Sequence, residues 1–154
     1  MSDDWKLPWA GGCRCDRVRF EISAPPIATM ACHCRGCQKM TASAFSLSIL
    51  IPAPGFTVTG DTAIGGLHGA ARHFHCDYCK SWMFTRPEGM DMFVNVRATL
   101  LDDCSWFVPF VETATSEGLP WAKTGATHSF PNIPPPETFA PLVEEFARAA
   151  ARPR

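Results

Sequence analysis

The chain has no long apolar run, and this absence excludes a helical membrane protein. A helix that spans a bilayer needs roughly 18 to 20 consecutive apolar residues. Charged residues, glycine or proline interrupt every apolar stretch well before that length. The first residues, Met-Ser-Asp-Asp-Trp-Lys-Leu-Pro-Trp, lack the basic head and apolar stretch of a secretory signal. We therefore expect a soluble protein that stays in the cytoplasm, where thiols remain reduced.

An excess of charge of one sign is also missing. The 14 Lys and Arg residues nearly match the 15 Asp and Glu residues, and charged residues make up only 19% of the chain. With a formal net charge of −1, the protein has no bulk attraction for nucleic-acid phosphate. We therefore expect neither nucleic acid nor a membrane as a partner, and the composition leaves the oligomeric state open.

Helical patterns are few, and short strand-like segments take their place. Two helices are predicted, a short turn at residues 35–40 and an amphipathic helix at 137–151. The proline-rich residues 118–136 are expected to form an extended arm packed by Trp121 and Phe130. Strands are predicted at residues 17–23, 43–51, 56–59, 71–75, 82–85, 92–96 and 106–111, separated by turn residues. The prediction is a mainly β fold with a short C-terminal helix.

Cysteine is what the chain has in excess. Seven of its eight cysteines fall into three clusters, Cys13-Arg-Cys15, Cys32-His-Cys34-Arg-Gly-Cys37 and Cys76-Asp-Tyr-Cys79. A disulfide framework needs an oxidising compartment and usually a smaller chain. Two cysteines separated by one residue on a strand also point to opposite faces, which makes a bridge between them awkward. We therefore predict that the clustered thiols bind zinc or a similar soft-ligand metal.

Seven ligands divide naturally into a closed site and an open one. Four thiolates complete a tetrahedral zinc site, while three leave a coordination position free for water or substrate. A C-x-x-C turn directs both sulfurs to one metal, and the central cluster is compact enough to share another. The predicted sets are Cys13, Cys15, Cys76 and Cys79 for the closed site, and Cys32, Cys34 and Cys37 for the open site. Spacing alone leaves open a second partition, in which Cys13 and Cys15 join two of the central cysteines.

The order of these motifs is similar to that of a known family. The motifs are Gly11-Gly-Cys-Arg-Cys15, Cys32-His-Cys34-Arg-Gly-Cys37-Gln-Lys, Arg72-His-Phe-His-Cys76-Asp-Tyr-Cys79 and Leu119-Pro-Trp121. Over roughly residues 10 to 125 this series resembles the glutathione-dependent formaldehyde-activating enzymes, a family that includes centromere protein V-like proteins. The resemblance implies a β-tent fold of small antiparallel sheets around zinc knuckles. It also implies a single zinc-binding domain over residues 1–154, with a C-terminal arm and helix at 126–154.

The resemblance further implies two zinc ions per chain, a structural one on the four-cysteine set and a catalytic one on the three-cysteine set. The implied activity is that of a carbon–sulfur lyase or synthase acting on a small thiol and an aldehyde. Addition of glutathione to formaldehyde, which gives S-hydroxymethylglutathione, is the example. This chain departs from the family where it has Thr41-Ala42-Ser43 and Lys80 in place of common glycines. Lys80 is costly in the left-handed turn often found there, and these loops leave the particular thiol and aldehyde open.

Several side chains are candidates for substrate contacts or proton transfer. Arg35 and Lys39, near the open site, are predicted to bind the carboxylates of a glutathione-like ligand. His33 and His75 adjoin ligand cysteines, so each is either a proton carrier or a surface or supporting group. Glu112 can face the site or end a strand in solvent. The aromatic residues Trp82, Phe84, Trp106, Phe107 and Trp121 are expected in the core or around a pocket, and Cys104 as a spare buried thiol.

A non-catalytic, zinc-stabilised scaffold or partner-binding module is the alternative function. It requires that His33, His75 or a residue of another chain closes the second zinc site. The fourth ligand of that metal therefore separates the enzyme from the scaffold.

Overall fold

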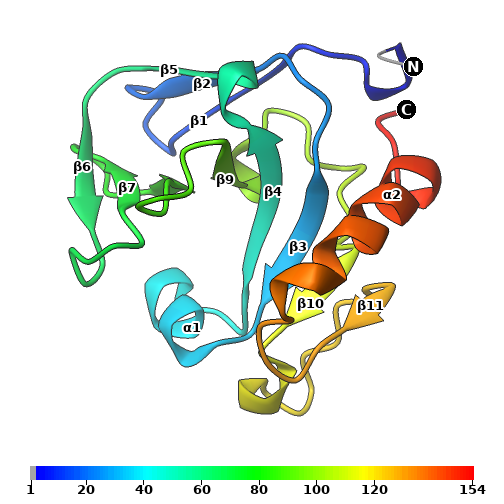
Figure 1. The fold of residues 1–154 in the computed structure, drawn as a ribbon. Coiled ribbons are helices and arrows are strands. Elements are labelled where there is room, and N and C mark those ends of the chain that lie inside the picture. The colour runs from blue at the N-terminus through cyan, green and yellow to red at the C-terminus, as the bar shows by residue number, and fades with distance from the viewer. Residues whose placement is uncertain (1–2) are drawn as a thin grey trace.

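The computed structural model describes residues 3–154, which form two β-sheets and two α-helices (Figure 1). The smaller sheet is antiparallel, in the order β1 (Trp9–Gly12), β2 (Arg19–Ile22) and β5 (Phe56–Thr59). The larger sheet has the order β11-β10-β3-β4-β9-β8-β7-β6. Its strands are β3 (Ala28–Cys32), β4 (Ser46–Pro52), β6 (Thr62–Gly65), β7 (His73–Cys76), β8 (Trp82–Thr85), β9 (Phe93–Arg97), β10 (Val111–Thr113) and β11 (His128–Ser129).

The helices are α1 (Arg35–Thr41) and α2 (Phe139–Ala149), and the mainly β prediction is confirmed. Short 3₁₀ turns lie at Asp3–Trp5, Ala53–Gly55, Ala98–Leu100, Thr115–Glu117 and Pro136–Thr138. Within residues 3–154 no helix combines the length and the apolar character needed to cross a bilayer. Figure 1 shows α1 at the end of the larger sheet where β3 stops and β4 starts. Helix α2 contacts the residue before β10 through Phe146 and Phe110, and it contacts β11 through the ion pair of Glu145 with His128.

The larger sheet is not purely antiparallel, because β10 runs parallel to both β3 and β11. Residues 106–111 were expected to form a strand, but only Val111 belongs to one. The apolar side chains there serve the core, since Trp106 and Phe110 are buried. Strand β3 escaped prediction because both its faces are covered, so its sequence shows no polar alternation.

Strand β1 was also missed, and its glycines explain why. A Cβ on Gly11 would lie 2.4 Å from both the Leu100 carbonyl oxygen and Cζ of Phe20. The glycine therefore lets the strand approach its neighbours closely, a role that strand propensity does not reveal. Strands β6 and β11 were not predicted either.

The core lies between the two sheets and contains Ile49, Ile51, Val94, Val96 and Phe84 of the larger sheet and Phe20, Ile22 and Phe56 of the smaller one. An aromatic cluster extends it to α2, where the rings of Trp5 and Phe146 stack with centroids 5.7 Å apart. The predicted apolar face of this helix is confirmed, because Leu142 and Phe146 are buried. Phe130 packs on the core as expected, whereas Trp121 does not pack the arm against the core, because 74% of its surface is exposed.

Candidate metal centres

The first centre brings together four thiols from two segments that lie 61 positions apart in the sequence, counted from Cys15 to Cys76. Cys13 and Cys15 lie in the turn after β1, Cys76 ends β7, and Cys79 completes the following turn. All four sulfur atoms lie within 4.8 Å of one another. The Cys13 and Cys15 sulfurs are 3.4 Å apart and those of Cys15 and Cys76 are 3.8 Å apart. Four sulfurs about 2.3 Å from one zinc ion are separated by about 3.8 Å, so this group, hereafter the clasp, fits zinc.

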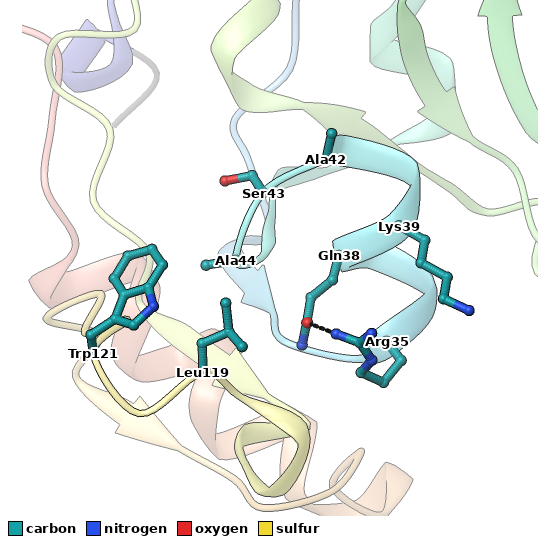
Figure 2. A pocket seen from close by; sticks show the side chains of 8 residues that line it. All are labelled: Arg35, Gln38, Lys39, Ala42, Ser43, Ala44, Leu119 and Trp121. Carbon is teal, nitrogen blue, oxygen red and sulfur yellow. Dashed lines mark hydrogen bonds between the residues drawn. The ribbon is translucent and has the colours of Figure 1, made fainter.

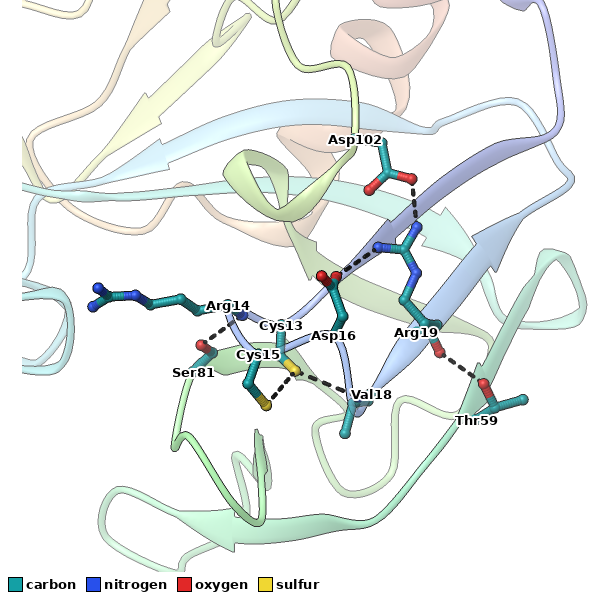
Figure 3. Close-up of polar contacts among 9 residues, drawn as sticks. All are labelled: Cys13, Arg14, Cys15, Asp16, Val18, Arg19, Thr59, Ser81 and Asp102. Carbon is teal, nitrogen blue, oxygen red and sulfur yellow. Dashed lines mark hydrogen bonds and ion pairs between the residues drawn. The ribbon is translucent and has the colours of Figure 1, made fainter.

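Hydrogen bonds orient the thiols of the clasp. The backbone N–H of Val18 donates to Cys13 Sγ at 3.3 Å (Figure 3), and that of Cys79 donates to Cys76 Sγ at 3.5 Å. Ser81 joins the two halves, since its Oγ accepts from Arg14 N at 3.3 Å and lies 3.2 Å from Cys79 Sγ. Burial opposes ionisation of Cys79, but hydrogen bonds from Ser81 outweigh it and lower the pKa of Cys79 to about 5. The clasp is therefore prepared to bind a cation.

The turns of the clasp use left-handed backbone at non-glycine residues. Lys80 has φ of 60°, as expected where the family commonly has glycine, and its N–H donates to the Cys76 carbonyl at 3.0 Å. Asp16 has the same φ of 60° and forms an ion pair with Arg19 at 3.1 Å. Arg19 also pairs with Asp102, as Figure 3 shows. These contacts hold the turn that carries Cys13 and Cys15.

The second centre is local. Cys32 ends β3, Cys34 is the N-cap of α1 and Cys37 lies in the first turn of that helix. Their sulfurs lie within 4.8 Å of one another, and Cys34 Sγ accepts from the backbone N–H of Cys37 at 3.3 Å. Among residues 3–154, no histidine, aspartate, glutamate or further cysteine joins this group, hereafter the three-cysteine loop. The thiols thus group as in the first partition, with three cysteine sulfurs at the second centre.

The three-cysteine loop is also suited to a cation. Hydrogen bonds from the Cys37 thiol, the Cys34 backbone and the Thr113 hydroxyl together outweigh the effect of burial and lower the pKa of Cys32 to about 5. The contact between the Cys32 and Cys37 thiols raises the pKa of Cys37, while the Ser46 hydroxyl acts in the opposite direction. The two thiols share a proton, and a soft cation such as zinc can take its place.

Side chains of β10 and of the turn after it form hydrogen bonds with residues of the three-cysteine loop. His33 is only 2% exposed, and its Nε2 lies 2.8 Å from Glu112 Oε2. The Glu112 carboxylate also accepts hydrogen bonds from Thr124 at 2.7 Å and from Ser129. Glu112 is therefore not a solvated strand end, because its side chain is 15% exposed and bonded to three groups. His33 occupies the supporting position that the sequence offered as one of its two roles.

A second set of bonds ties the same turn to α1. The Gln38 amide donates to the carbonyl oxygens of His33 at 2.7 Å and Glu117 at 2.9 Å. The Glu117 carboxylate accepts from the backbone N–H of Arg35 at 2.6 Å. Together with the His33–Glu112 pair these contacts form a brace, and neither Gln38 nor Glu117 was singled out in the sequence. Gln38 directly follows Cys37 in α1, whereas Glu112 and Glu117 reach the loop through the parallel pairing of β10 with β3.

The predicted substrate contacts Arg35 and Lys39 line a cavity of about 490 Å³ on one side of α1. The other lining residues are Gln38, Ala42, Ser43, Ala44, Leu119 and Trp121. Figure 2 shows Leu119 and Trp121 across the hollow from the segment after α1, while Arg35 and Lys39 project from the helix. The exposed indole of Trp121 therefore belongs to a cavity wall rather than to the core.

The remaining candidates lie elsewhere. His75 does not join either cysteine group; it stacks on Trp82, with ring centroids 6.4 Å apart, and burial lowers its pKa. Phe84 and Trp106 are core residues, and Phe107 and Cys104 pack against the core. Trp82 is half-buried and lines a second cavity together with Arg97, a residue that the sequence gave no reason to single out.

Residues 8–117 match the sequence profile of a family described as glutathione-dependent formaldehyde-activating enzyme. No curated protein sequence matches the chain. A crystal structure of a Rhodobacter sphaeroides protein from a structural genomics programme is 16% identical, with a TM-score of 0.48. That match covers 60% of this chain and 87% of the other, and at this similarity it carries no inference about function.

Proposed function

Because the chain belongs to the glutathione-dependent formaldehyde-activating enzyme family, we propose that it makes or breaks a carbon–sulfur bond between a small thiol and an aldehyde. The site of this reaction is the three-cysteine loop of Cys32, Cys34 and Cys37. The proposal depends chiefly on the ligand count there, since no fourth protein ligand joins the loop among residues 3–154. Zinc bound at the loop would stabilise a substrate thiol as thiolate at neutral pH.

The reaction balances without an oxidant or reductant. In the forward direction sulfur forms a bond to the carbonyl carbon, and the π electron pair moves to the carbonyl oxygen. That oxygen takes up the proton which the thiol lost. Glutathione and formaldehyde would give S-hydroxymethylglutathione in this way, and the reverse reaction would release both.

The chain's own residues position the thiol ligands. Thr113 and Ser46 place hydroxyls beside Cys32 and Cys37, where they favour the ionised sulfurs. The brace from Glu112 and Glu117 keeps the loop and the start of α1 in place. Arg35 and Lys39 would bind carboxylates of the substrate in the cavity beside α1. The walls of that cavity, including Leu119 and Trp121, would limit which thiols fit.

The clasp has a different task in this proposal. It would hold the second zinc ion of the chain, with four protein ligands and no position for substrate. Cys15 and Cys76 are 61 positions apart in the sequence, so a metal there crosslinks the turn after β1 to the end of β7. We assign this zinc a structural role.

Cobalt substitution tests the proposed function, because thiolate-bound cobalt absorbs visible light. Glutathione should change the absorption of the three-sulfur site and leave that of the four-sulfur site unaltered. NMR should then show that formaldehyde is converted to its glutathione adduct faster with the protein than in buffer. The variant Cys34→Ser is the control and should show neither effect. A fully metallated protein with no spectral change and no rate increase would instead be a zinc-stabilised scaffold.

A further inference from the structure

A second cavity, of about 480 Å³, lies between the two metal centres. Met40 and Thr41, at the end of α1, line one part of it, and Lys80 and Ser81, directly after Cys79, line another. Ser43 lines this cavity and the one beside Arg35, so the two flank the C-terminal end of α1. The remaining lining residues are Phe45, Leu47, Trp82, Arg97, Thr99 and Leu100.

The charged groups that line this cavity are both cations. Lys80 has its ammonium 2.9 Å from Asp77, in an exposed pair of little strength. Arg97 is different, because it is only 7% exposed and its guanidinium carbon lies 4.0 Å from the centre of the Trp82 ring. Among the described residues, no Asp or Glu pairs with Arg97. Within residues 3–154 its guanidinium donates a single hydrogen bond, from Nη2 to the Asn95 carbonyl oxygen at 3.3 Å, and its Nε has no partner.

A buried guanidinium with unmet donors is costly unless an anion compensates it. Arg19 and Arg72, which are far more exposed, each have an aspartate partner. The sheet register places Arg97 near the three-cysteine loop, since Cys32 pairs with Ser46 and Ser48 pairs with Arg97, all on one face. Negative charge on the thiols of the three-cysteine loop favours the cation, but Nε of Arg97 still has no hydrogen-bond partner within residues 3–154.

We propose that Arg97 binds a carboxylate of the thiol substrate within the second cavity. The identity of this ligand rests on the proposed function, and the cavity supplies the recognition. A guanidinium matches the two oxygens of a carboxylate, and hydroxyls of Thr41, Ser43, Ser81 and Thr99 surround the same space. A glutathione-like thiol carries two carboxylates. It would then find Arg97 on one side of α1 and Arg35 with Lys39 on the other.

Calorimetry with S-methylglutathione tests the cavity apart from the reaction. This ligand keeps both carboxylates but has no thiol to ionise, so its binding does not require that a thiolate reach the metal. We expect it to bind the zinc-loaded protein, and Arg97→Gln to weaken binding by about 10- to 100-fold, as expected for a lost charge-assisted bond. The matched control is Arg152→Gln, because Arg152 also lies over a tryptophan, 3.7 Å from the ring centre of Trp5. That variant should bind like the wild type.

A pair of thiols tests the same residue at the metal. In cobalt-substituted protein, 3-mercaptopropionate should bind more tightly than 3-mercaptopropanol, and Arg97→Gln should abolish this preference without weakening the alcohol. Should Arg97→Gln fail to fold, Arg97→Lys serves instead. It keeps the charge without the planar fork and should weaken S-methylglutathione binding several-fold.

Two outcomes would overturn the assignment. One is equal S-methylglutathione binding by wild type and both Arg97 variants, and the other is a carboxylate preference that survives Arg97→Gln. If metal affinity falls in that second case, the residue only balances the thiolates. If no thiol alters the cobalt spectrum while S-methylglutathione binding still depends on Arg97, the proposed reaction fails and the carboxylate site stands.

Discussion

The clasp and the three-cysteine loop use the same ligand atoms but depend on the rest of the protein in opposite ways. The clasp brings together sulfurs 61 positions apart, so its metal would be a crosslink between distant segments. The three-cysteine loop takes its ligands from six consecutive residues, and hydrogen bonds from β10 and the turn after it hold that loop in place. A metal that crosslinks distant segments needs a full set of protein ligands. A loop that hydrogen bonds already hold in place can leave one coordination position of its metal free for substrate.

The largest expected effect comes from breaking the clasp. Cys79→Ser should release one zinc ion per chain and lower the free energy of unfolding by about 4 kcal/mol, the loop-closure value for a crosslink of roughly 60 residues. Urea denaturation and zinc analysis measure the two quantities. Retention of two zinc ions with unchanged stability would remove Cys79 from the clasp.

Breaking the three-cysteine loop should cost about half as much. Cys34→Ser is expected to release the other zinc ion and lower the unfolding free energy by about 2 kcal/mol, because the metal closes a loop of only about six residues. The protein should stay folded by circular dichroism and should no longer bind thiols. Cys104→Ser is the control and should keep both metals. Global unfolding of Cys34→Ser would instead indicate a structural role for both sites.

The brace can be weakened without touching a ligand. Glu112→Gln removes the negative charge of the carboxylate to which His33, Thr124 and Ser129 are hydrogen-bonded. Zinc affinity at the three-cysteine loop should fall about tenfold, as is typical when a residue that supports a metal ligand is changed. Competition with a chelator measures this affinity, and the clasp should be unaffected. Glu145→Gln, which alters the half-exposed pair with His128, is the matched control. An equal loss at both sites would contradict a local role for the brace.

Wild type and Glu112→Gln can also be compared across a range of pH. Burial raises the pKa of Glu112, but hydrogen bonds from Ser129, Thr124 and His33 outweigh it and hold the pKa below its ordinary value. A depressed carboxyl pKa adds stability above the unfolded value, about 4.3, and this stability is lost as pH falls through the folded value. The advantage of wild type over Glu112→Gln in urea should therefore be full near pH 6 and shrink below about pH 4. A constant advantage across that range would count against the shifted pKa.

The smallest expected effects concern the backbone of the two centres. Lys80, with φ of 60°, and Ala42, with φ of 51°, occupy left-handed backbone beside the clasp and the three-cysteine loop respectively. Lys80→Gly and Ala42→Gly should each raise the free energy of unfolding by about 0.5 to 1 kcal/mol, since glycine relieves the strain at some entropic cost. Ala147→Gly, in the interior of α2, is the control and should lower it by about 1 kcal/mol. Thermal denaturation distinguishes these signs.

Features that depend on neighbouring residues could be predicted from the sequence, and those that depend on distant pairing could not. Cysteine spacing favoured the two groups of thiols that the structure brings together, although it left a second partition open, and the replacement of glycine by Lys80 pointed to a left-handed turn. The apolar face of α2 followed from its periodicity. The brace and Arg97 were not foreseen, because the parallel alignment of β10 with β3 and the register of β9 bring them to the site. The bonds of Glu112 were not foreseen for the same reason, since its partners come from the residue after β3, from β11 and from the segment between β10 and β11.

The position of the brace in the chain also has a consequence for biosynthesis. All four clasp cysteines precede Glu112, Glu117, Thr124 and Ser129 in the chain, so they emerge from the ribosome before those residues do. The clasp can therefore assemble on a nascent chain, and the three-cysteine loop, although its cysteines also emerge early, reaches its final shape only after the residues of the brace have emerged. The order of synthesis delays a reactive, incompletely liganded centre until the fold that controls access to it is almost complete.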